Sequence, residues 1–191
     1  PPRLVHDKSP SLYCQRFVHR CHFQRQLRQP AQMNQHIEIR KYREEDLEPL
    51  KTITAICFDG VSIDQNMEHR LGLVATRDWQ WRKTRHVDAD VSANCDGIIV
   101  ACCDAEPIGY ITTRIDVEAK VGGIPNYAVL PAFQKRGIGK RLIEGALDYL
   151  RNAGMECVRI ETLDQNEVGK HFYPKLGFEL IATQHHYALR L

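Results

Sequence analysis

Two glycines and several basic side chains stand directly before an amphipathic stretch in residues 131–154, PAFQKRGIGKRLIEGALDYLRNAG. Apolar residues recur there every three or four positions from Ile138 onward, which predicts a helix that ends at Gly154. A helix start has backbone N–H groups without partners and carries the positive end of the helix dipole, so it attracts anions. Gly137 and Gly139 would let a phosphate approach the backbone closely. The basic side chains around this turn are Lys135, Arg136 and Lys140. The segment therefore predicts a phosphate-binding site.

Two common phosphate motifs do not fit this turn. A P-loop needs a glycine where the chain has Gln134 and a serine or threonine where it has Arg141. A dinucleotide-binding loop needs a third glycine at the position of Leu142, and no early strand–helix–strand unit supports it. What remains is a Q/R-x-x-G-x-G/A pattern from Gln134 to Gly139, between a predicted strand and a long helix. A glycine-rich helix start can also be a packing device, so a second motif has to decide.

Such a motif follows about 30 residues later, in residues 166–178, NEVGKHFYPKLGF. It matches the pattern N-x(5)-F-Y-x-K-L-G-F. Together, and in this order and spacing, the two segments resemble the acyl-CoA-binding segment and the second signature of the GNAT N-acetyltransferase superfamily. The resemblance covers residues 34–191 and implies one α/β domain (α+β mixed). Its central sheet would be mixed and mostly antiparallel, splayed at the acyl-CoA site, with helices on both faces.

The resemblance also implies acetyl-CoA as the co-substrate and no metal. Backbone N–H groups of residues of roughly 135 to 140 would hold its pyrophosphate, and the strand ending at Val129 would separate from a strand at 156–162 to admit the thioester. Pro125 fits a bulge at the point of separation. The Val129 N–H would polarise the thioester carbonyl and hold the oxyanion of the tetrahedral intermediate. The residues expected to contact the cofactor are Val129, Gln134, Lys135, Arg136, Gly137, Ile138, Gly139, Lys140 and Asn166.

Two residues of the second motif have expected roles. Tyr173 stands where the family places a tyrosine that can protonate the departing thiolate as a general acid, and the alternative is a half-buried aromatic beside Phe172. Asn166 would bond the pantetheine arm of the cofactor or cap its own short helix.

The general base is left open by the sequence. Many members of the family carry a glutamate on the strand before the glycine turn, but this chain has no acid between Val121 and Val129. Glu161 is the tentative base, working through a water molecule. The other candidates are Glu118 and the imidazoles of His171, His185 and His186, which titrate near neutrality. For each of them a surface side chain is the alternative.

The expected enzyme is an N-acetyltransferase that transfers an acetyl group directly to a primary amine of a small molecule, amino acid, peptide or protein. Residues 57–66 and 182–187 would select the acceptor. Three acids in or near the first of these segments could attract a cationic amine: Asp59, Asp64 and Glu68. The alternative is that they are solvated surface charges with no role in binding. Trp79 and Trp81 are expected to pack their helix. Two alternatives remain: a non-catalytic acyl-CoA sensor on the same fold, and an acetyltransferase docked on RNA or ribosomes through a basic tail.

That tail is residues 1–33. Of the 26 Lys and Arg and the 24 Asp and Glu residues, six basic residues and one acidic residue lie there, so the tail carries about +5 and the remainder about −3. We expect a flexible extension, and Met33 is a candidate natural start. The acidity of the remainder argues against nucleic-acid binding by the domain itself.

The composition predicts a soluble, cytoplasmic protein. With 43% hydrophobic and 26% charged residues the chain is typical of globular proteins, and its longest apolar runs span only a strand. Seven scattered cysteines fit reduced thiols better than disulfides. A cluster of Cys14, His19, Cys21 and His22 matches no zinc module. A homodimer remains open, since members of the family often pair through terminal strands.

The elements that must position these residues follow from periodicity and turn signals. The expected strands are 37–42, a hairpin of 97–103 and 107–117, 121–129 with an irregularity at Pro125, 156–162 and a final hairpin within 178–191. The expected helices are 43–58, 62–79, 138–154 and 166–176, and residues 82–97 are assigned only as polar.

Overall fold

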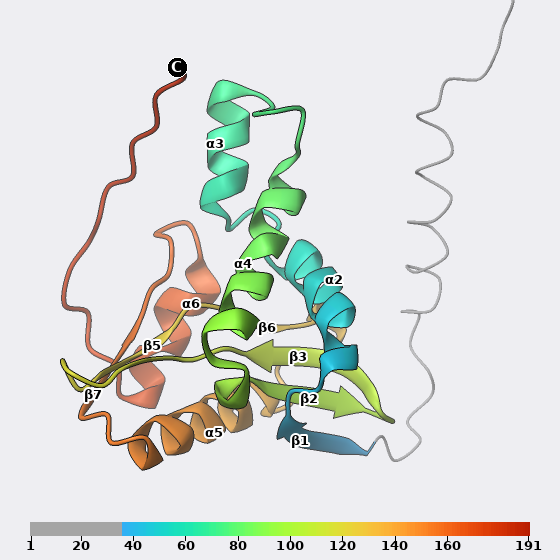
Figure 1. Ribbon diagram of the computed structural model, residues 1–191, viewed down its shortest axis with the longest axis vertical. Helices are drawn as coiled ribbons and strands as arrows, with labels where there is room; N and C mark the ends of the chain where they lie inside the picture. The colour runs from blue at the N-terminus through green and yellow to red at the C-terminus, as the bar shows by residue number, and fades with distance from the viewer. Residues whose placement is uncertain (1–35) are drawn as a thin grey trace, which may run out of the picture. The chain divides into compact units, whose positions relative to one another are not determined.

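The computed structural model describes residues 36–191, which form two small sheets with helices on both sides (Figure 1). The first sheet is antiparallel, in the order β1 (Ile37–Lys41), β2 (Ile99–Cys103), β3 (Glu106–Ile111), β6 (Tyr127–Val129). The second has the order β4 (Arg114–Asp116), β5 (Val121–Ile124), β7 (Cys157–Ile160), in which β5 and β7 are parallel. The predicted class, a mixed and mostly antiparallel α/β fold, is therefore confirmed. The predictions for the tail and for Cys14, His19, Cys21 and His22 lie outside the described residues.

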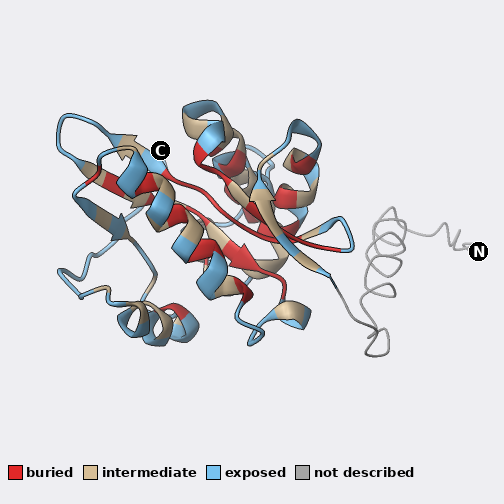
Figure 2. Ribbon diagram, turned by 90° about the horizontal axis from the view of Figure 1, so that it is seen from below, coloured by how far each residue is buried: buried red, intermediate tan, exposed pale blue. Residues whose placement is uncertain are grey.

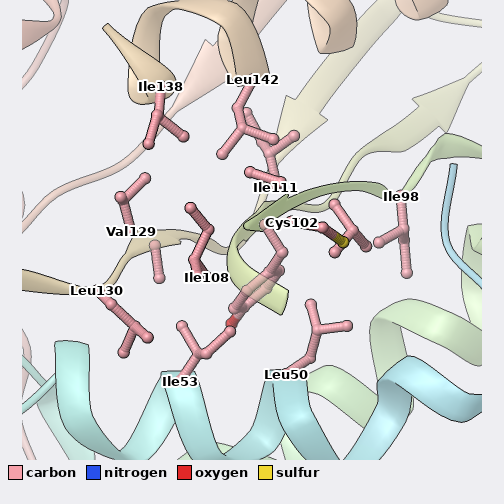
Figure 3. Packing of buried hydrophobic residues seen from close by; sticks show 14 of the residues in the cluster. Leu50, Ile53, Ile98, Cys102, Ile108, Ile111, Val129, Leu130, Ile138 and Leu142 are labelled. Atoms are coloured by element: carbon pink, nitrogen blue, oxygen red, sulfur yellow. The ribbon is translucent and has the colours of Figure 1, made fainter. Parts of the chain in front are cut away.

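The helices sandwich the first sheet. The helices are α2 (Leu47–Cys57), α3 (Ile63–Leu71), α4 (Trp79–Asn94), α5 (Ile138–Asn152) and α6 (Glu167–Phe172). Helix α2 packs against β3 and β6, α4 packs against α2 and α3, and α5 covers the opposite face of β2, β3 and β6 (Figure 1). Figure 3 shows Leu50 and Ile53 of α2 reaching the sheet from one side and Ile138 and Leu142 of α5 from the other. Burial is concentrated in the central strands and in the sides of α2 and α5 that face them (Figure 2).

Helix α5 confirms the most periodic part of the sequence. It begins at Ile138 and ends at Asn152, close to the predicted bounds, and Gly154 follows in the left-handed conformation at φ 79°. One stripe of the helix is buried: Ile138, Leu142, Ile143, Ala146 and Leu150. The hairpin of β2 and β3 also turns where the sequence predicts it, at Asp104 and Ala105. The single strand predicted at 107–117 is wrong in its extent, because β3 ends at Ile111 and Arg114–Asp116 forms β4 in the other sheet.

The helix predicted at 62–79 is wrong in its extent, and the polar stretch after it is a helix. Helix α3 ends at Leu71 because Gly72 takes a positive φ of 73°, and Val74 is exposed. Helix α4 then begins after Asp78, whose carboxylate accepts a hydrogen bond from the Trp81 N–H at 2.8 Å. The buried stripe of α4 is Trp79, Lys83, Val87 and Asp90. Two of these four residues are charged, so hydrophobic periodicity could not reveal the helix.

The predicted final hairpin is also wrong. Residues 179–191 form no strand, and their large apolar side chains are exposed: Leu180, Ile181, Tyr187 and Leu189. An alternating pattern forms a strand only where a neighbouring strand pairs with its backbone and another layer covers one face. Within residues 36–191 neither condition is met for this segment, since the edge strand β7 pairs with β5 alone.

The segment predicted as one strand at 121–129 is split at Pro125 and Asn126. Strand β5 pairs with β7 from Val121↔Cys157 to Ile124↔Ile160, and the pairing stops there. Strand β6 begins at Tyr127 and pairs with β3 in the other sheet. The chain after Ile124 therefore leaves β7, which separates the two strands as expected.

Buried polar groups brace this break. Asn126 is 2% exposed; its Nδ2 donates to Asp90 Oδ2 at 2.6 Å, and its backbone N–H donates to Thr112 Oγ1 at 3.0 Å. Asp90 is fully buried and also accepts hydrogen bonds from Thr112 Oγ1 at 2.7 Å and from the Arg114 guanidinium at 2.9 Å. A buried carboxylate needs such donors, because desolvation is otherwise too costly. Helix α4 is thereby tied to the point where the strand changes sheets.

The first turn of α5 contacts β6 through a glycine. A Cβ atom at Gly139 would overlap the hydroxyl of Tyr127, and it would lie 3.6 Å from the ring of Phe172. Tyr127 and Phe172 stack with centroids 6.0 Å apart and planes 12° from parallel. The packing alternative for this glycine therefore applies to Gly139, whereas Gly137 has open space around it and needs glycine for its φ of 76°.

Three further features of the described part of the chain concern membrane-spanning helices, metal ligands and cysteines. None of its helices is both long and apolar enough to cross a bilayer. Between residues 36 and 191, no three His, Cys, Asp or Glu side chains are grouped so that they could hold a metal ion. The cysteines in the same region are all free: Cys57, Cys95, Cys102, Cys103 and Cys157.

We expect Asp90→Ala to lower the free energy of unfolding by about 3 kcal/mol, because Thr112 and Asn126 would lose their buried acceptor. The measurement is urea denaturation followed by circular dichroism. Asp148→Ala is the control: its carboxylate is 69% exposed and pairs with Arg151, so its loss should cost no more than about 0.5 kcal/mol. Equal effects of the two substitutions would show that the network does not brace the break.

Gly139→Ala should destabilise the fold by about 1–3 kcal/mol, because the added methyl group meets the Tyr127 hydroxyl. In the Tyr127→Phe background the same substitution should cost much less, since that oxygen is gone. A double-mutant cycle by thermal denaturation measures the coupling. Additive effects would mean that the helix start does not rest on Tyr127.

Candidate active site

The glycine turn is an exposed helix start that directly follows β6. After Leu130 the chain makes a 3-10 turn, Pro131–Phe133, and Lys135 takes a positive φ of 60°. Gly137 then caps α5 at φ 76°. The N–H groups of the first turn of a helix have no partner within it, and here the turn is exposed. The turn therefore presents free donors and the positive end of the α5 dipole to solvent, as an anion site requires.

The side chains around this turn fall into two groups. Gln134 is part of the scaffold, because its Nε2 donates to the Val129 carbonyl at 2.9 Å and so ties the turn to the end of β6. The three basic residues are exposed: the Arg136 guanidinium lies 5.1 Å from the Phe133 ring centroid, and Lys140 Nζ is 3.6 Å from Glu144. All three side chains therefore place positive charge close to the turn.

The backbone N–H and C=O of Val129 point away from β3, the strand that pairs with β6. The Leu130 N–H donates to the Ile108 carbonyl at 2.9 Å, and the Thr112 N–H donates to the Asn126 carbonyl at 2.8 Å. Antiparallel pairing alternates, so the N–H of Val129, which is opposite Gly109, points to the other side. Strand β6 is the edge of its sheet, and no strand of residues 36–191 pairs with it there. The Val129 N–H therefore faces the region from which β7 has separated.

The two sequence motifs meet at a cluster of aromatic rings. Tyr127 of β6 stacks on Phe172 of α6; Phe172 contacts Tyr173 edge-on at 5.9 Å, and Tyr173 contacts Phe178 edge-on at 6.0 Å. Burial raises the pKa of Tyr173 to about 12. Burial, and then the nearby Tyr173, raise the pKa of Tyr127. Both hydroxyls therefore keep their protons at neutral pH, which a proton donor requires.

Asn166 caps its own helix. Its Oδ1 accepts a hydrogen bond from the Gly169 N–H at 3.1 Å, and its Nδ2 donates to Thr162 Oγ1 at 2.9 Å. The structure thus shows the capping role, one of the two that the sequence left open.

The candidate bases from the sequence are scattered over the surface. Glu161 follows β7 and is exposed, and Glu118 lies in the exposed turn between β4 and β5. His171 is exposed, with Nδ1 2.7 Å from the Glu167 carbonyl. His185 and His186 are exposed in the C-terminal segment. None of these five side chains is buried near Val129.

The acids that were expected to attract a cationic amine are engaged within the fold. Asp64 and Glu68 lie 3.5 Å and 3.1 Å from the guanidinium of Arg82 on α4. Asp59 accepts a hydrogen bond from Gln65 Nε2 at 2.7 Å. These carboxylates therefore stabilise the packing of α3 against α4 and the turn before it.

The two tryptophans differ from each other. Trp79 is 6% exposed and packs α4 as predicted, but Trp81 is 40% exposed. The guanidinium groups of Arg77 and Arg85 each lie over the Trp81 ring, 4.8 Å from its centroid.

Sequence reasoning missed a buried lysine at the break between β5 and β6. Lys83 is 8% exposed, and its Nζ donates to Asn126 Oδ1 at 2.7 Å. Burial lowers its pKa to about 8, and the carboxylates of Asp64 and Asp90 oppose this shift. The only signal in the sequence was its spacing of four residues from Trp79 and Val87, which becomes visible once α4 is known to be a helix.

Comparisons with known proteins fit this geometry. Residues 64–178 match the sequence profile of the Acetyltransferase (GNAT) family. A mycothiol acetyltransferase of Rhodococcus jostii is 29% identical over 117 residues, which is 58% of this chain and 38% of that protein. An N-alpha-acetyltransferase of Sulfurisphaera tokodaii is 29% identical over 99 residues, 46% of this chain and 59% of that protein. The chain thus matches less than two thirds of the length of either relative.

A solved structure shares the fold. The PaiA N-acetyltransferase of Thermoplasma acidophilum, crystallised in complex with coenzyme A, superimposes with a TM-score of 0.63 at 25% sequence identity. The match covers 78% of this chain and 93% of that one. Because the family profile covers more than half of the chain, including both motifs, the protein belongs to the GNAT acetyltransferase family.

Proposed function

We propose that this chain transfers an acetyl group from acetyl-CoA to a primary amine. The observation that carries the proposal is the edge of β6, where the free Val129 N–H lies just before an exposed, basic helix start. Membership of the GNAT family supports the reaction, and the coenzyme A complex of the Thermoplasma acidophilum protein supports the cofactor. The named relatives include a mycothiol acetyltransferase and an N-alpha-acetyltransferase, so an amine acceptor is the coarse class that they support.

In this proposal the helix start binds the pyrophosphate of acetyl-CoA. Backbone N–H groups between Lys135 and Lys140 donate to its oxygens, and the dipole of α5 and the exposed basic side chains add attraction. The acyl end of the molecule then lies along the free edge of β6. There the Val129 N–H donates to the thioester oxygen and stabilises the negative charge that this oxygen gains during attack.

The transfer itself forms one bond and breaks one. The nitrogen of the acceptor bonds to the thioester carbon and gives up its excess proton to a base, and the carbon–sulfur bond breaks with its electron pair on sulfur. The hydroxyl of Tyr173 donates its proton to the leaving thiolate, which gives free coenzyme A. Its pKa of about 12 keeps the donor protonated over the whole working range of pH.

The helix start predicts a charge-sensitive binding site. In calorimetric titrations of the full chain with acetyl-CoA, Gly137→Glu should weaken binding at least about 10-fold, equivalent to about 1.4 kcal/mol, because it places a carboxylate at the anion site. Gly60→Glu is a matched control: Gly60 also has a positive φ, at 80°, with nothing within 4 Å of an added Cβ, but it lies between α2 and α3. Its affinity should stay within about two-fold of the wild type. No binding by the wild type would overturn the proposed function.

The acid role predicts that Tyr173→Phe lowers kcat by about 100-fold and leaves the affinity for acetyl-CoA nearly unchanged. A donor with a pKa of about 12 stays almost fully protonated up to about pH 10, so the wild-type rate should show no alkaline decline from this group below that pH. Thiol release would be followed with a panel of acceptors: an alanine-initiated peptide, a lysine-containing peptide and an aminoglycoside.

Tyr149→Phe is the control for this experiment. Tyr149 lies near the other end of α5, where its hydroxyl donates to Asn94 at 2.8 Å, so its loss should leave kcat unchanged. A Tyr173→Phe enzyme with the wild-type kcat would show that Tyr173 is only a packing residue.

A further inference from the structure

The break between β5 and β6 holds a buried amine that the reaction described above does not use. Lys83 Nζ donates to Asn126 Oδ1 and lies 4.0 Å from the centroid of the Phe58 ring. An ammonium group has three donors, and Asn126 supplies the one hydrogen-bond acceptor that the described residues offer it. The amine is therefore poorly solvated, and it is held in one direction.

This amine lies on the side of β6 that faces α2 and α4. The side chain of Asn126 contacts α4 and that of Tyr127 contacts α5, because successive side chains of an extended chain alternate between faces. The end of α2 joins the amine to Val129: Phe58 lies against Lys83, and the Sγ of Cys57 is 3.5 Å from the Val129 carbonyl. The two residues at the end of α2 thus connect Lys83 with Val129, where the thioester lies in the proposed reaction.

Several charged groups surround the amine. Asp64 is on α3, and α4 carries Asp90 and His86. The two carboxylates are committed elsewhere, Asp64 to Arg82 and Asp90 to its network with Arg114 of β4, so neither accepts a hydrogen bond from Lys83. Burial, and then Lys83, lower the pKa of His86.

The uncharged form of Lys83 is consequently accessible at a pH close to neutral. Desolvation favours the neutral amine and brings the pKa to about 8, although the carboxylates of Asp64 and Asp90 act in the opposite direction. Strongly shifted groups are common where proton transfer occurs. A neutral lysine has a lone pair that can accept a proton. Because one N–H of Lys83 donates to Asn126, the lone pair points in another direction.

We infer that Lys83 is the general base of the proposed transfer, held in position by Asn126 on the acceptor side of β6. The inference rests on the proposed function. As the acceptor nitrogen bonds to the thioester carbon, its excess proton passes to the Nζ of neutral Lys83. The thiolate that leaves takes the proton of Tyr173, and the lysine ammonium and the tyrosine phenolate then exchange protons with solvent. This assignment supplies the base that the segment from Val121 to Val129 lacks, since it has no acid.

The test measures acetyl transfer to hydroxylamine as a function of pH, at saturating acetyl-CoA and with the uncatalysed reaction subtracted. Hydroxylamine is already uncharged at neutral pH, so its own ionisation does not limit the rate there. The active form of a general base is the deprotonated one, so the wild-type rate should rise with pH and level off above about pH 8.

Two substitutions of Lys83 separate catalysis from packing. Lys83→Arg keeps the charge but cannot lose its proton in this range, and Lys83→Met keeps the approximate volume without a titrating group. Both should be at least about 100-fold slower at pH 8 and should lose the rise with pH, while the affinity for acetyl-CoA stays within about two-fold. Lys51→Met is the matched control, because Lys51 lies on the adjacent α2 and is paired with Glu48 and Asp88. It should retain both the wild-type rate and the wild-type profile.

The outcomes are distinguishable. If the wild type transfers acetyl groups and either Lys83 variant keeps its rate or its rise with pH, Lys83 is only a tie between α4 and the break, and the base assignment alone is wrong. If the wild type binds acetyl-CoA but transfers to neither hydroxylamine nor any acceptor of the panel, the proposed function is wrong and this inference is wrong with it.

Discussion

The chain between Val121 and Val129 changes sheets, and the buried polar groups at this change have to be satisfied. Pro125 has no N–H to donate, and Asn126 lies in the interior between two sheets that no longer share a strand. Asp90 meets this need by accepting hydrogen bonds from Asn126 and Thr112. Because leaving such groups unpaired is costly, the same contacts that permit the break also attach α4 to it. These contacts hold the chain where β6 separates from β7, and they place Lys83 of α4 against Asn126.

The free edge of β6 then acquires its chemical character from what lies on each side. On the α5 side, Gly139 allows the helix start to approach Tyr127, and Phe172 stacks on the same ring. On the other side, Cys57 and Phe58 at the end of α2 contact the Val129 carbonyl and Lys83. The helix start that is the proposed anion site packs against one face of β6, and the poorly solvated amine of Lys83 lies on the other face.

The sequence-based predictions succeeded where a pattern is local. The periodicity of α5, the glycine turn before it and the hairpin of β2 and β3 needed only neighbouring residues, and the structure confirms them. They failed where tertiary context decides. Helix α4 was missed because Lys83 and Asp90 occupy its buried stripe, and the final hairpin was predicted from alternation although residues 179–191 have no strand to pair with in the described fold. The cofactor contacts and the role of Tyr173 stay predictions.

The sequence by itself determined the family and the glycine turn at which a phosphate site is proposed, because glycines and basic residues at a helix start form a contiguous motif whose chemistry is local. It also located the irregularity at Pro125, since proline restricts its own backbone wherever it occurs. Only the tertiary structure decided which way the Val129 N–H faces, which depends on the register between β3 and β6. It alone brought Lys83 to Asn126, 43 positions apart in the chain. A side chain is desolvated by residues distant in sequence, so its burial and its proton affinity cannot be read from its neighbours along the chain.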